Sequence, residues 1–353
     1  MDSTGTILTL TTFGESHGPA LGGVLTGLPA GAAVDMNMLQ DYVNRRSPAD
    51  RYATSRREPD RVEILSGIFE GQTLGTPVGY IIRNTDTRSA DYTQWADAYR
   101  PNHADFTYEA KYGLRDWRGG GRASARETAA RVVAGALAVQ LLQHAGVTVN
   151  AYTSGIGSAS LKPDYSLYDI AEAWKYPLCC PDADAAADMQ RQLENARSQG
   201  DSLGGTVTCV IRGMKAGVGE PVFGKLQSRL AAAMLSIPAA KGFDYGLGFV
   251  AASARGSEVI DRFRQDFTTE TNFSGGIQGG ITNGADIYFR VAFKPVATLM
   301  RPMETVDRSG NKVTLPPRGR HDVCVVPRAV VVVEAMAALT VLDAMLLNRS
   351  SRL

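Results

Sequence analysis

The sequence has few cysteines and almost no net charge. Its four cysteines include one close pair, Cys179 and Cys180, but no C-x-x-C spacing, so neither a zinc site nor a disulfide framework is indicated. We expect no bound metal. The formal net charge of +1 argues against nucleic-acid binding, which usually requires a basic excess.

Nucleotide-binding fingerprints and targeting segments are also missing. The chain has no G-x-x-x-x-G-K-[ST] run and no G-x-G-x-x-G between a strand and a helix, which excludes a P-loop and a Rossmann fingerprint. The first ten residues show no basic stretch followed by a long apolar run, so no signal peptide is predicted. Glu334 and Asp343 interrupt the apolar run at Ala329–Leu347, which favours a buried helix over a membrane span. We expect a cytoplasmic protein with no membrane partner.

What the sequence does have is arginine. It contains 29 arginines and 8 lysines, and 14 of the arginines precede residue 132, where Lys111 is the one lysine. Arginine grips carboxylate and phosphate groups with two parallel hydrogen bonds. The segment RRSPADRYATSRREPDR at 45–61 carries six arginines. Surface salt bridges are one interpretation, but an irregular loop of this kind is better suited to closing over a small anion.

Hydrophobic patterns predict an α+β fold with antiparallel sheets, since strands and helices do not alternate one for one. The predicted helices are Met36–Asn44, Arg126–Ala145, Ala183–Arg197, Phe223–Ser236 and Ala329–Asn348. The predicted strands are Val62–Phe69, Val78–Arg83, Val147–Thr153, Gly205–Arg212, Phe249–Ala254 and Asp286–Phe293. No linker or repeat divides the chain, so residues 1–353 are expected to form one domain.

Long irregular segments at 44–61, 84–125, 268–285 and 300–328 are where the chemistry is expected. His17 and His103 lie in loops of this type, and imidazole exchanges protons near neutral pH, whereas His144 lies near a helix end. The glycine-rich stretch SGGIQGGITNG at 274–284 is interpreted as a backbone slot for a flat ligand, with a tight turn as the alternative.

The stretch RGGGRASARET at 118–128 combines glycines, arginines and a helix start. Ser124 and Glu127 match the S-x-x-E capping box, which makes Ser124 the predicted N-cap of the Arg126–Ala145 helix. A helix N-terminus also attracts anions, and the preceding glycines let its amides approach a ligand.

Together these segments resemble the chorismate synthase family. The resemblance rests, in order from about Thr11 to Leu347, on TTFGESHG, RRSPADRYATSRREPD, RPNHADFTYEAKYGLRDWRGGGRASARET, SIPAAKGFDYGLGF, SGGIQGGITNG, KPVATL and GRHDVCVVPRA. It implies an enzyme that eliminates phosphate from 5-enolpyruvylshikimate 3-phosphate in an anti 1,4 sense to give chorismate, using reduced FMN without net redox change. It also implies a single-domain β-α-β sandwich that assembles as a homotetramer.

The resemblance assigns a role to each matching residue. His17, with Ser16 beside it, would protonate the departing phosphate, His103 would act on the reduced flavin, and Asp322 would help to remove the C6 proton. The substrate's phosphate and carboxylates would be held by Arg46, Arg51, Arg100, Arg126 and Arg320. The flavin would be lined by Arg122, Ala123, Ser124, Pro238, Ala239, Gly279, Lys294, Pro295, Val296, Ala297, Thr298 and Arg320.

Two positions depart from the common family pattern. Ala123 stands for the first serine of GRSSARET, and Val323 for the proline of GRHDPC, which could loosen the turn that presents Asp322. Two sources of reduced FMN are left open, NADPH used directly or an external flavin reductase, and the lack of an obvious extra domain favours the reductase. A flavin-dependent oxidoreductase and an RNA-binding module are the alternative functions.

Overall fold

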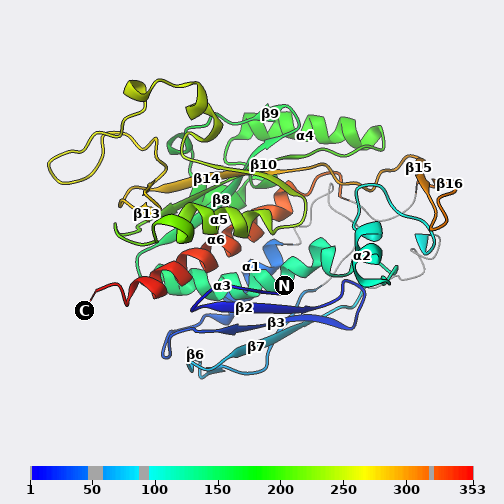
Figure 1. Cartoon of the computed structure of the whole chain (residues 1–353), viewed down its shortest axis with the longest axis horizontal. Coiled ribbons are helices and arrows are strands. Elements are labelled where there is room, and N and C mark those ends of the chain that lie inside the picture. The colour runs from blue at the N-terminus through cyan, green and yellow to red at the C-terminus, as the bar shows by residue number, and fades with distance from the viewer. Residues whose placement is uncertain (1, 47–58, 87–94, 318–321, 353) are drawn as a thin grey trace.

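Two antiparallel sheets enclose a layer of helices in the computed structural model, which describes residues 2–46, 59–86, 95–317 and 322–352 (Figure 1). The first sheet has the strand order β1-β2-β3-β7-β4, and the second has the order β11-β14-β10-β8-β9. The strands of the first sheet are β1 (Ser3–Thr4), β2 (Thr9–Gly14), β3 (Ala20–Thr26), β7 (Val78–Arg83) and β4 (Val62–Ile64). Those of the second are β11 (Ala240–Tyr245), β14 (Ile287–Phe293), β10 (Gly205–Arg212), β8 (Thr148–Ile156) and β9 (Ala159–Ser160).

The helices between the sheets form the centre of the core. They are α1 (Met36–Arg45), α3 (Thr128–His144), α5 (Leu226–Leu235) and α6 (Val326–Asn348), while α4 (Ala183–Ser198) lies outside the second sheet (Figure 1). α3 and α6 pack tightly, since a Cβ on Gly135 would lie 2.2 Å from the Cβ of Ala335. Helix α6 is long and apolar enough to cross a membrane, but most of it is buried here against protein. A core helix explains that composition.

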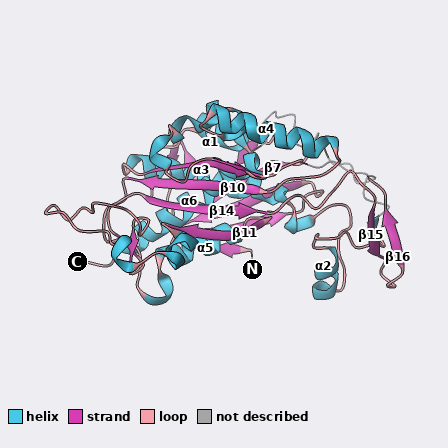
Figure 2. Ribbon diagram, turned by 90° about the horizontal axis from the view of Figure 1, so that it is seen from above, coloured by secondary structure: helices cyan, strands magenta, loops and turns pink. Residues whose placement is uncertain are grey.

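Smaller elements lie around the sandwich. α2 (Asp105–Tyr112) and the hairpin β15–β16 (Met303–Val306 and Lys312–Leu315) lie together beyond one end of the layers (Figure 2). Two more hairpins are β5–β6 (Ile68–Phe69 and Gln72–Thr73) and β12–β13 (Ile277–Gln278 and Ile281–Thr282). Short 3-10 helices cover Gly121–Ala123, Ala125–Glu127, Tyr165–Leu167, Ile170–Lys175, Pro177–Cys179, Val222–Gly224, Gly248–Ser253 and Gly256–Glu258.

The predicted α+β sandwich with helices between outer antiparallel sheets is confirmed. The five predicted helices are present, with ends shifted by a few residues. One predicted strand is wrong: Phe249–Ala254 coincides with the 3-10 helix at Gly248–Ser253, and Phe249 is 82% exposed. This run is apolar, but it lies outside both sheets and therefore has no neighbouring strand to pair with. One core cluster draws residues from both sheets, which supports the proposal that the chain forms one domain.

Candidate functional site

The turn between β2 and β3 carries Ser16 and His17. Ser16 Oγ lies 3.1 Å from His17 Nδ1, a hydrogen bond that orients the imidazole ring. The glycine-rich loop packs directly against this pair, because a Cβ on Gly119 would lie 2.3 Å from His17 Nδ1 and 2.8 Å from Ser16 Oγ. Asn84 holds the turn from the other side through its side-chain amide, which donates to the Glu15 carbonyl at 3.1 Å and the Gly18 carbonyl at 2.8 Å. The fold thus brings GESHG and RGGGR together.

Arg100 connects the His103 segment to the same loop. Its guanidinium donates to both carboxylate oxygens of Asp105, at 2.8 and 2.7 Å, and to the Gly119 carbonyl at 3.2 Å. Both side chains are buried. Burial opposes the ionisation of Asp105, but the hydrogen bonds and charge of Arg100 outweigh it and lower the pKa of the carboxyl. Arg100 therefore works first as a link between segments.

His103 faces the KPVAT segment. Its Nε2 lies 3.2 Å from Thr298 Oγ1. Burial, together with the positive charges of Arg100 and Lys294, lowers the pKa of His103 to about 4, although Asp105 opposes the shift. The imidazole is therefore neutral near pH 7. A neutral ring has one N–H donor and one acceptor nitrogen, which suits hydrogen bonding to a ligand.

The predicted flavin residues that flank β14 gather near His103. Lys294 donates its backbone N–H to the Ala239 carbonyl at 3.0 Å and its ammonium to the Asn102 carbonyl at 3.2 Å. Ala239 follows Pro238 in a turn and has a φ of 69°, in the left-handed region that non-glycine residues rarely adopt. Such strain is often found at ligand-binding positions. The Val296 carbonyl accepts from Ser202 Oγ at 2.7 Å, so this segment is held from several sides.

Two of the predicted substrate-binding arginines, Arg46 and Arg126, meet at one buried carboxylate. Arg46 donates to Asp60 Oδ2 at 2.9 Å, and Arg126 pairs with Asp60 Oδ1. Arg126 also donates from Nε to Asn84 Oδ1 at 2.9 Å. Burial lowers the pKa of Arg46 to about 10, although Asp60 opposes the shift. The guanidinium of Arg46 therefore stays charged at neutral pH.

Asp322 joins this cluster through Arg328. One terminal nitrogen of Arg328 lies 3.0 Å from each carboxylate oxygen of Asp322, while Arg328 Nε donates to the Arg46 carbonyl at 3.1 Å. The next residue, Val323, is buried, and its carbonyl accepts from the Leu203 N–H at 2.9 Å. This backbone bond fixes the segment after Asp322 without the family's proline.

The loop residues Arg122, Ala123 and Ser124 lie at the start of α3. Arg122 donates to Thr12 Oγ1 at 2.7 Å and also contacts Asp2. Ser124 caps the 3-10 turn that precedes α3 by accepting from the Arg126 N–H at 3.2 Å, which confirms Ser124 as an N-cap residue. The predicted capping box is wrong, because the Ser124 side chain bonds Arg126 and not Glu127, and Glu127 accepts from Thr12 at 2.7 Å and Arg131 at 2.8 Å. Tertiary partners satisfy this carboxylate.

Gly279 is not brought to the others within one chain. It lies in the β12–β13 turn at the start of α5, where the Leu226 N–H donates to the Gly280 carbonyl at 3.0 Å. Pro238 follows the opposite end of α5, whose ten residues rise about 15 Å. The turn requires glycine at Gly279 and Gly280, which have φ values of 63° and 98°, and a Cβ on Gly280 would also lie 2.4 Å from the Glu220 carbonyl oxygen. Arg51 and Arg320 lie outside the described residues.

Sequence reasoning missed the partners of the predicted residues. Asp60, Asn84 and Arg328 each contact a predicted residue, yet none was singled out. Asp60 and Arg328 lie within the quoted segments RRSPADRYATSRREPDR and GRHDVCVVPRA, so their motifs were visible. Their contacts were not, because only the fold brings these segments together.

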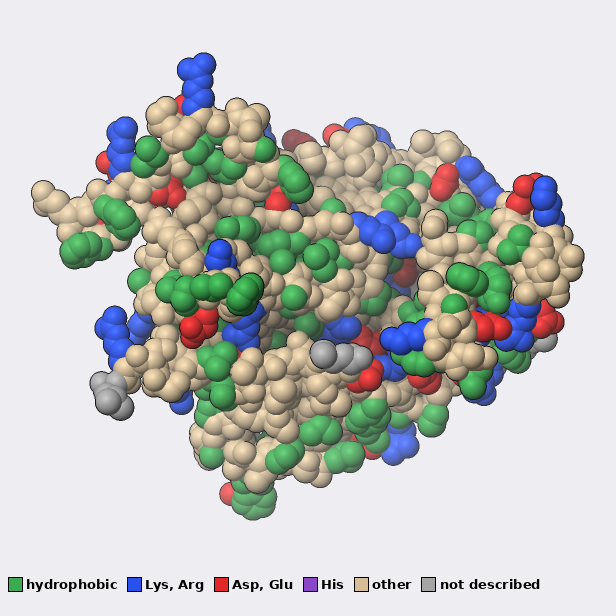
Figure 3. Space-filling view, viewed as in Figure 1, with side chains coloured by type: hydrophobic (Ala, Val, Ile, Leu, Met, Phe, Trp, Pro, Cys, Tyr) green, Lys and Arg blue, Asp and Glu red, His purple; other side chains and the backbone are tan. Residues whose placement is uncertain are grey.

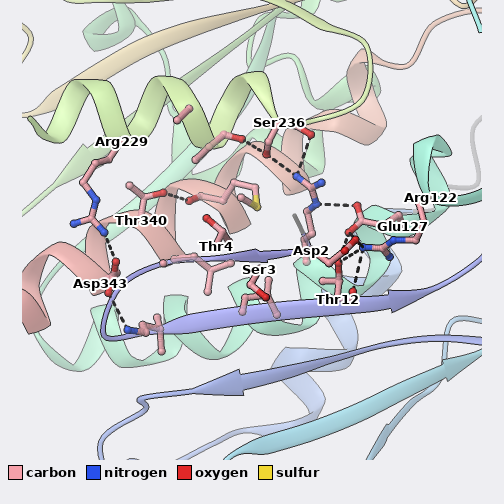
Figure 4. A pocket seen from close by; sticks show the side chains of 18 of the residues that line it. Asp2, Ser3, Thr4, Thr12, Arg122, Glu127, Arg229, Ser236, Thr340 and Asp343 are labelled. Atoms are coloured by element: carbon pink, nitrogen blue, oxygen red, sulfur yellow. Dashed lines mark hydrogen bonds and ion pairs between the residues drawn. The ribbon is translucent and has the colours of Figure 1, made fainter. Parts of the chain in front are cut away.

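A groove of about 740 Å³ lies beside the Arg122 loop, between the β1–β2 edge and helices α5 and α6. Figure 4 shows Arg122 and Glu127 at one end and the Arg229–Asp343 pair at the other. Of the predicted site residues that the structure describes, Arg122 alone lines it. The face drawn in Figure 3 mixes basic and acidic side chains and shows no single basic patch. No group of three or more potential metal ligands occurs among the described residues.

Comparisons with known proteins all point to one family. The family model described as chorismate synthase matches residues 8–346. A chorismate synthase of Christiangramia forsetii is 54% identical over 353 residues, covering 100% of this chain and 99% of that protein. One of Parabacteroides distasonis is 52% identical over 354 residues, covering 99% of each. A solved structure titled "Crystal Structure of Chorismate Synthase" superposes with a TM-score of 0.77 at 31% identity, covering 97% of this chain and 92% of that one.

Proposed function

The chain belongs to the chorismate synthase family of lyases, and we propose that it performs the anti 1,4-elimination of phosphate from 5-enolpyruvylshikimate 3-phosphate, with reduced FMN as cofactor. One observation carries this proposal. The segments of His17, Arg126, Arg46 and Asp322 form one connected set of hydrogen bonds and ion pairs, which runs through Asn84, Asp60 and Arg328. Groups with the expected roles in proton donation, anion binding and proton removal therefore converge.

The residues beside β14 fit a flavin. Reduced FMN would be held by Ala239, Lys294–Thr298 and His103, where a buried neutral imidazole adjoins a backbone-lined segment. When bound, reduced FMN would supply an electron transiently and recover it, so the elimination has no net redox change. Arg122–Ser124 follow Gly119 closely in the sequence and would contact the flavin from the glycine-rich loop. For Gly279 we propose no contact within the same subunit.

The protein side of the reaction follows from the residues at hand. The charges of Arg46 and Arg126 would hold anionic groups of the substrate, which carries a phosphate and two carboxylates. His17, oriented by Ser16, would donate a proton to the phosphate as the carbon–oxygen bond breaks and the bonding pair leaves with oxygen. Asp322, which is paired with Arg328, would accept the proton lost from C6. The bonding pair of that C–H forms a double bond to the adjacent ring carbon, and the existing ring double bond shifts to the carbon that loses phosphate.

An anaerobic assay tests the proposal. Purified protein is mixed with the enolpyruvyl substrate and chemically reduced FMN, and chorismate and phosphate are measured, with oxidised FMN as the control. We expect chorismate and phosphate in equal amounts without consumption of reductant. A stoichiometric loss of reductant would instead indicate a flavin-dependent oxidoreductase. A parallel reaction with NADPH as sole reductant separates self-reduction of FMN from dependence on an external reductase, which we favour.

We further propose a cytoplasmic homotetramer. The family supports the assembly, and the large hydrophobic side chains that are exposed between residues 222 and 267, such as Phe223 and Phe267, support a contact surface there. Light scattering at two protein concentrations measures the mass directly; a monomer at both would contradict the assembly.

A further inference from the structure

Asp60 occupies an unusual position between the two buried arginines. It is 1% exposed, and its backbone has a φ of 44°, in the left-handed region. An aspartate tolerates this conformation better than most residues, but a strained backbone persists only where its surroundings fix it. Here each carboxylate oxygen takes a different arginine, Oδ2 facing Arg46 and Oδ1 facing Arg126. The left-handed backbone of Asp60 is therefore found where its carboxylate is held by two guanidiniums.

The charges of this group do not balance. Arg46 and Arg126 carry two positive charges, and Asp60 supplies one negative charge between them. Arg328, the next arginine, is already paired with Asp322. One guanidinium nitrogen of each buried arginine, Arg46 Nε and Arg126 Nη2, is buried without a hydrogen-bond partner among the described residues. Buried donors of this kind are normally satisfied, so the pair is incomplete until it meets an acceptor.

The position of Asp60 also ties the two ends of the site together. From Arg126 the hydrogen bonds continue to Asn84 and the carbonyls beside His17, and from Arg46 they continue to Arg328 and Asp322. Asp60 is the link between these two halves. A change in its carboxylate would release both arginines at once.

We propose that Asp60 is a positioning residue that sets the spacing and orientation of Arg46 and Arg126 for the anionic substrate. This proposal rests on the proposed function. Asp60 itself does not bind the anion, since its negative charge would repel it. It acts by holding two like-charged side chains close together and leaving one donor on each unpaired.

Substrate binding tests the proposal without turnover. The dissociation constant of 5-enolpyruvylshikimate 3-phosphate is measured by calorimetry on the full chain with oxidised FMN, for wild type and Asp60→Asn. The asparagine keeps the shape of the side chain but turns an N–H group towards one guanidinium. We expect binding to weaken about tenfold to a hundredfold, the range that a hydrogen bond to a charged group supports. A folded Asp60→Asn variant that binds within twofold of wild type overturns the proposal.

A double-mutant cycle separates positioning from a general structural effect. If Asp60 acts through Arg126, adding Asp60→Asn to an Arg126→Gln variant costs less affinity than it does in wild type. Equal losses in both backgrounds would overturn the proposal. Asp343→Asn is the matched control, because Asp343 is also a buried aspartate paired with an arginine, Arg229, outside the site. It should lower the melting temperature and leave binding unchanged.

Two further measurements keep the outcomes distinct. If Asp60→Asn does not fold, Asp60→Glu is measured instead, because it keeps the charge and moves the carboxylate by one methylene. Substrate affinity should again fall at least tenfold. An Asp60→Glu variant that binds the substrate within twofold of wild type overturns the proposal. Chorismate formation by wild type with reduced FMN is assayed separately. A wild type that binds the substrate but forms no chorismate counts against the proposed function, whereas intact binding in the Asp60 variants counts against the role of Asp60.

Discussion

The backbone of Gly119 lies against the imidazole of His17, so closely that any side chain there would overlap the ring: a Cβ would stand 2.3 Å from Nδ1. The same Cβ would lie 2.8 Å from Ser16 Oγ. The loop at Gly119 thus limits where His17 can lie, and Arg100 fixes that loop by donating to the Gly119 carbonyl. The orientation of one proposed proton donor therefore depends on a glycine far away in sequence.

Gly119→Ala should lower kcat by roughly 10–100-fold, because displacing a catalytic group by about 1 Å can cost that much. The methyl group would push His17 and Ser16 out of position while the buried core stays intact. Steady-state kinetics with reduced FMN measures the loss, and a melting curve checks the fold. Gly256→Ala is the control, since a Cβ at Gly256 meets nothing within 4 Å. If Gly119→Ala and Gly256→Ala were equally active, the close contact between Gly119 and His17 would not affect catalysis.

His17→Ala should lose about 10²–10⁴-fold in kcat and keep its fold, because general acid catalysis contributes that range. Single-turnover kinetics with reduced FMN isolates the chemical step. His144→Ala is the matched control, since His144 is an exposed residue in the last turn of α3. A His17→Ala variant with the wild-type rate would remove His17 from the mechanism.

Glu334 makes stability depend on pH. It lies buried in α6, accepts a hydrogen bond from the Ala151 N–H at 2.8 Å, and burial raises its pKa to about 7. Below about pH 4.5 the carboxyl is protonated in both folded and unfolded chains. As the pH rises to about 7, the unfolded chain loses its proton first, so this group's contribution to stability falls. Glu334→Gln, which stays neutral, should be more stable than wild type by about 1–3 kcal/mol at pH 8.

Denaturant unfolding at pH 5 and pH 8 measures this effect. The advantage of Glu334→Gln over wild type should be larger at pH 8 than at pH 5. Asp35→Asn serves as the comparison, since Asp35 is an exposed N-cap residue of α1. An advantage of the same size at both pH values would mean that Glu334 does not titrate in this range.

Long helical patterns were the part of the fold that the sequence predicted best. α3 and α6 are buried on nearly all sides, so their apolar content is unmistakable. Strand β3 escaped prediction because Gly22 and Gly23 occupy positions where strands usually carry branched side chains. Those glycines make room for rings: a Cβ on Gly22 would lie 2.4 Å from Phe13, and one on Gly23 would lie 2.4 Å from Tyr80. Such packing depends on the neighbouring strands.

The functional site, like the fold, could be predicted from the sequence only in part. Motifs pointed to His17, His103 and Asp322, and in the structure their segments are bonded through Asn84, Arg100 and Arg328, respectively. The sequence could not show that Arg46 and Arg126 share Asp60, because Arg126 comes from a different segment from the other two residues. Nor could it show that Gly279 lies at the far end of α5. Local patterns indicate chemical groups, whereas long-range packing decides which of them meet.

Asp322→Asn should reduce kcat strongly and leave substrate binding nearly unchanged. The amide cannot accept the C6 proton, but it keeps the shape of the side chain beside Arg328. Loss of a general base costs about 10²–10⁴-fold. Because Arg328 also donates to the Arg46 carbonyl, its position survives the change. Substrate affinity measured with oxidised FMN should therefore stay within about threefold of wild type, while single-turnover chorismate formation falls.

Val323→Pro, which introduces the common family residue, is the control that alters the turn and not the carboxylate. If Asp322→Asn instead lost affinity as severely as rate, Asp322 would be acting on the arginines and not on the proton.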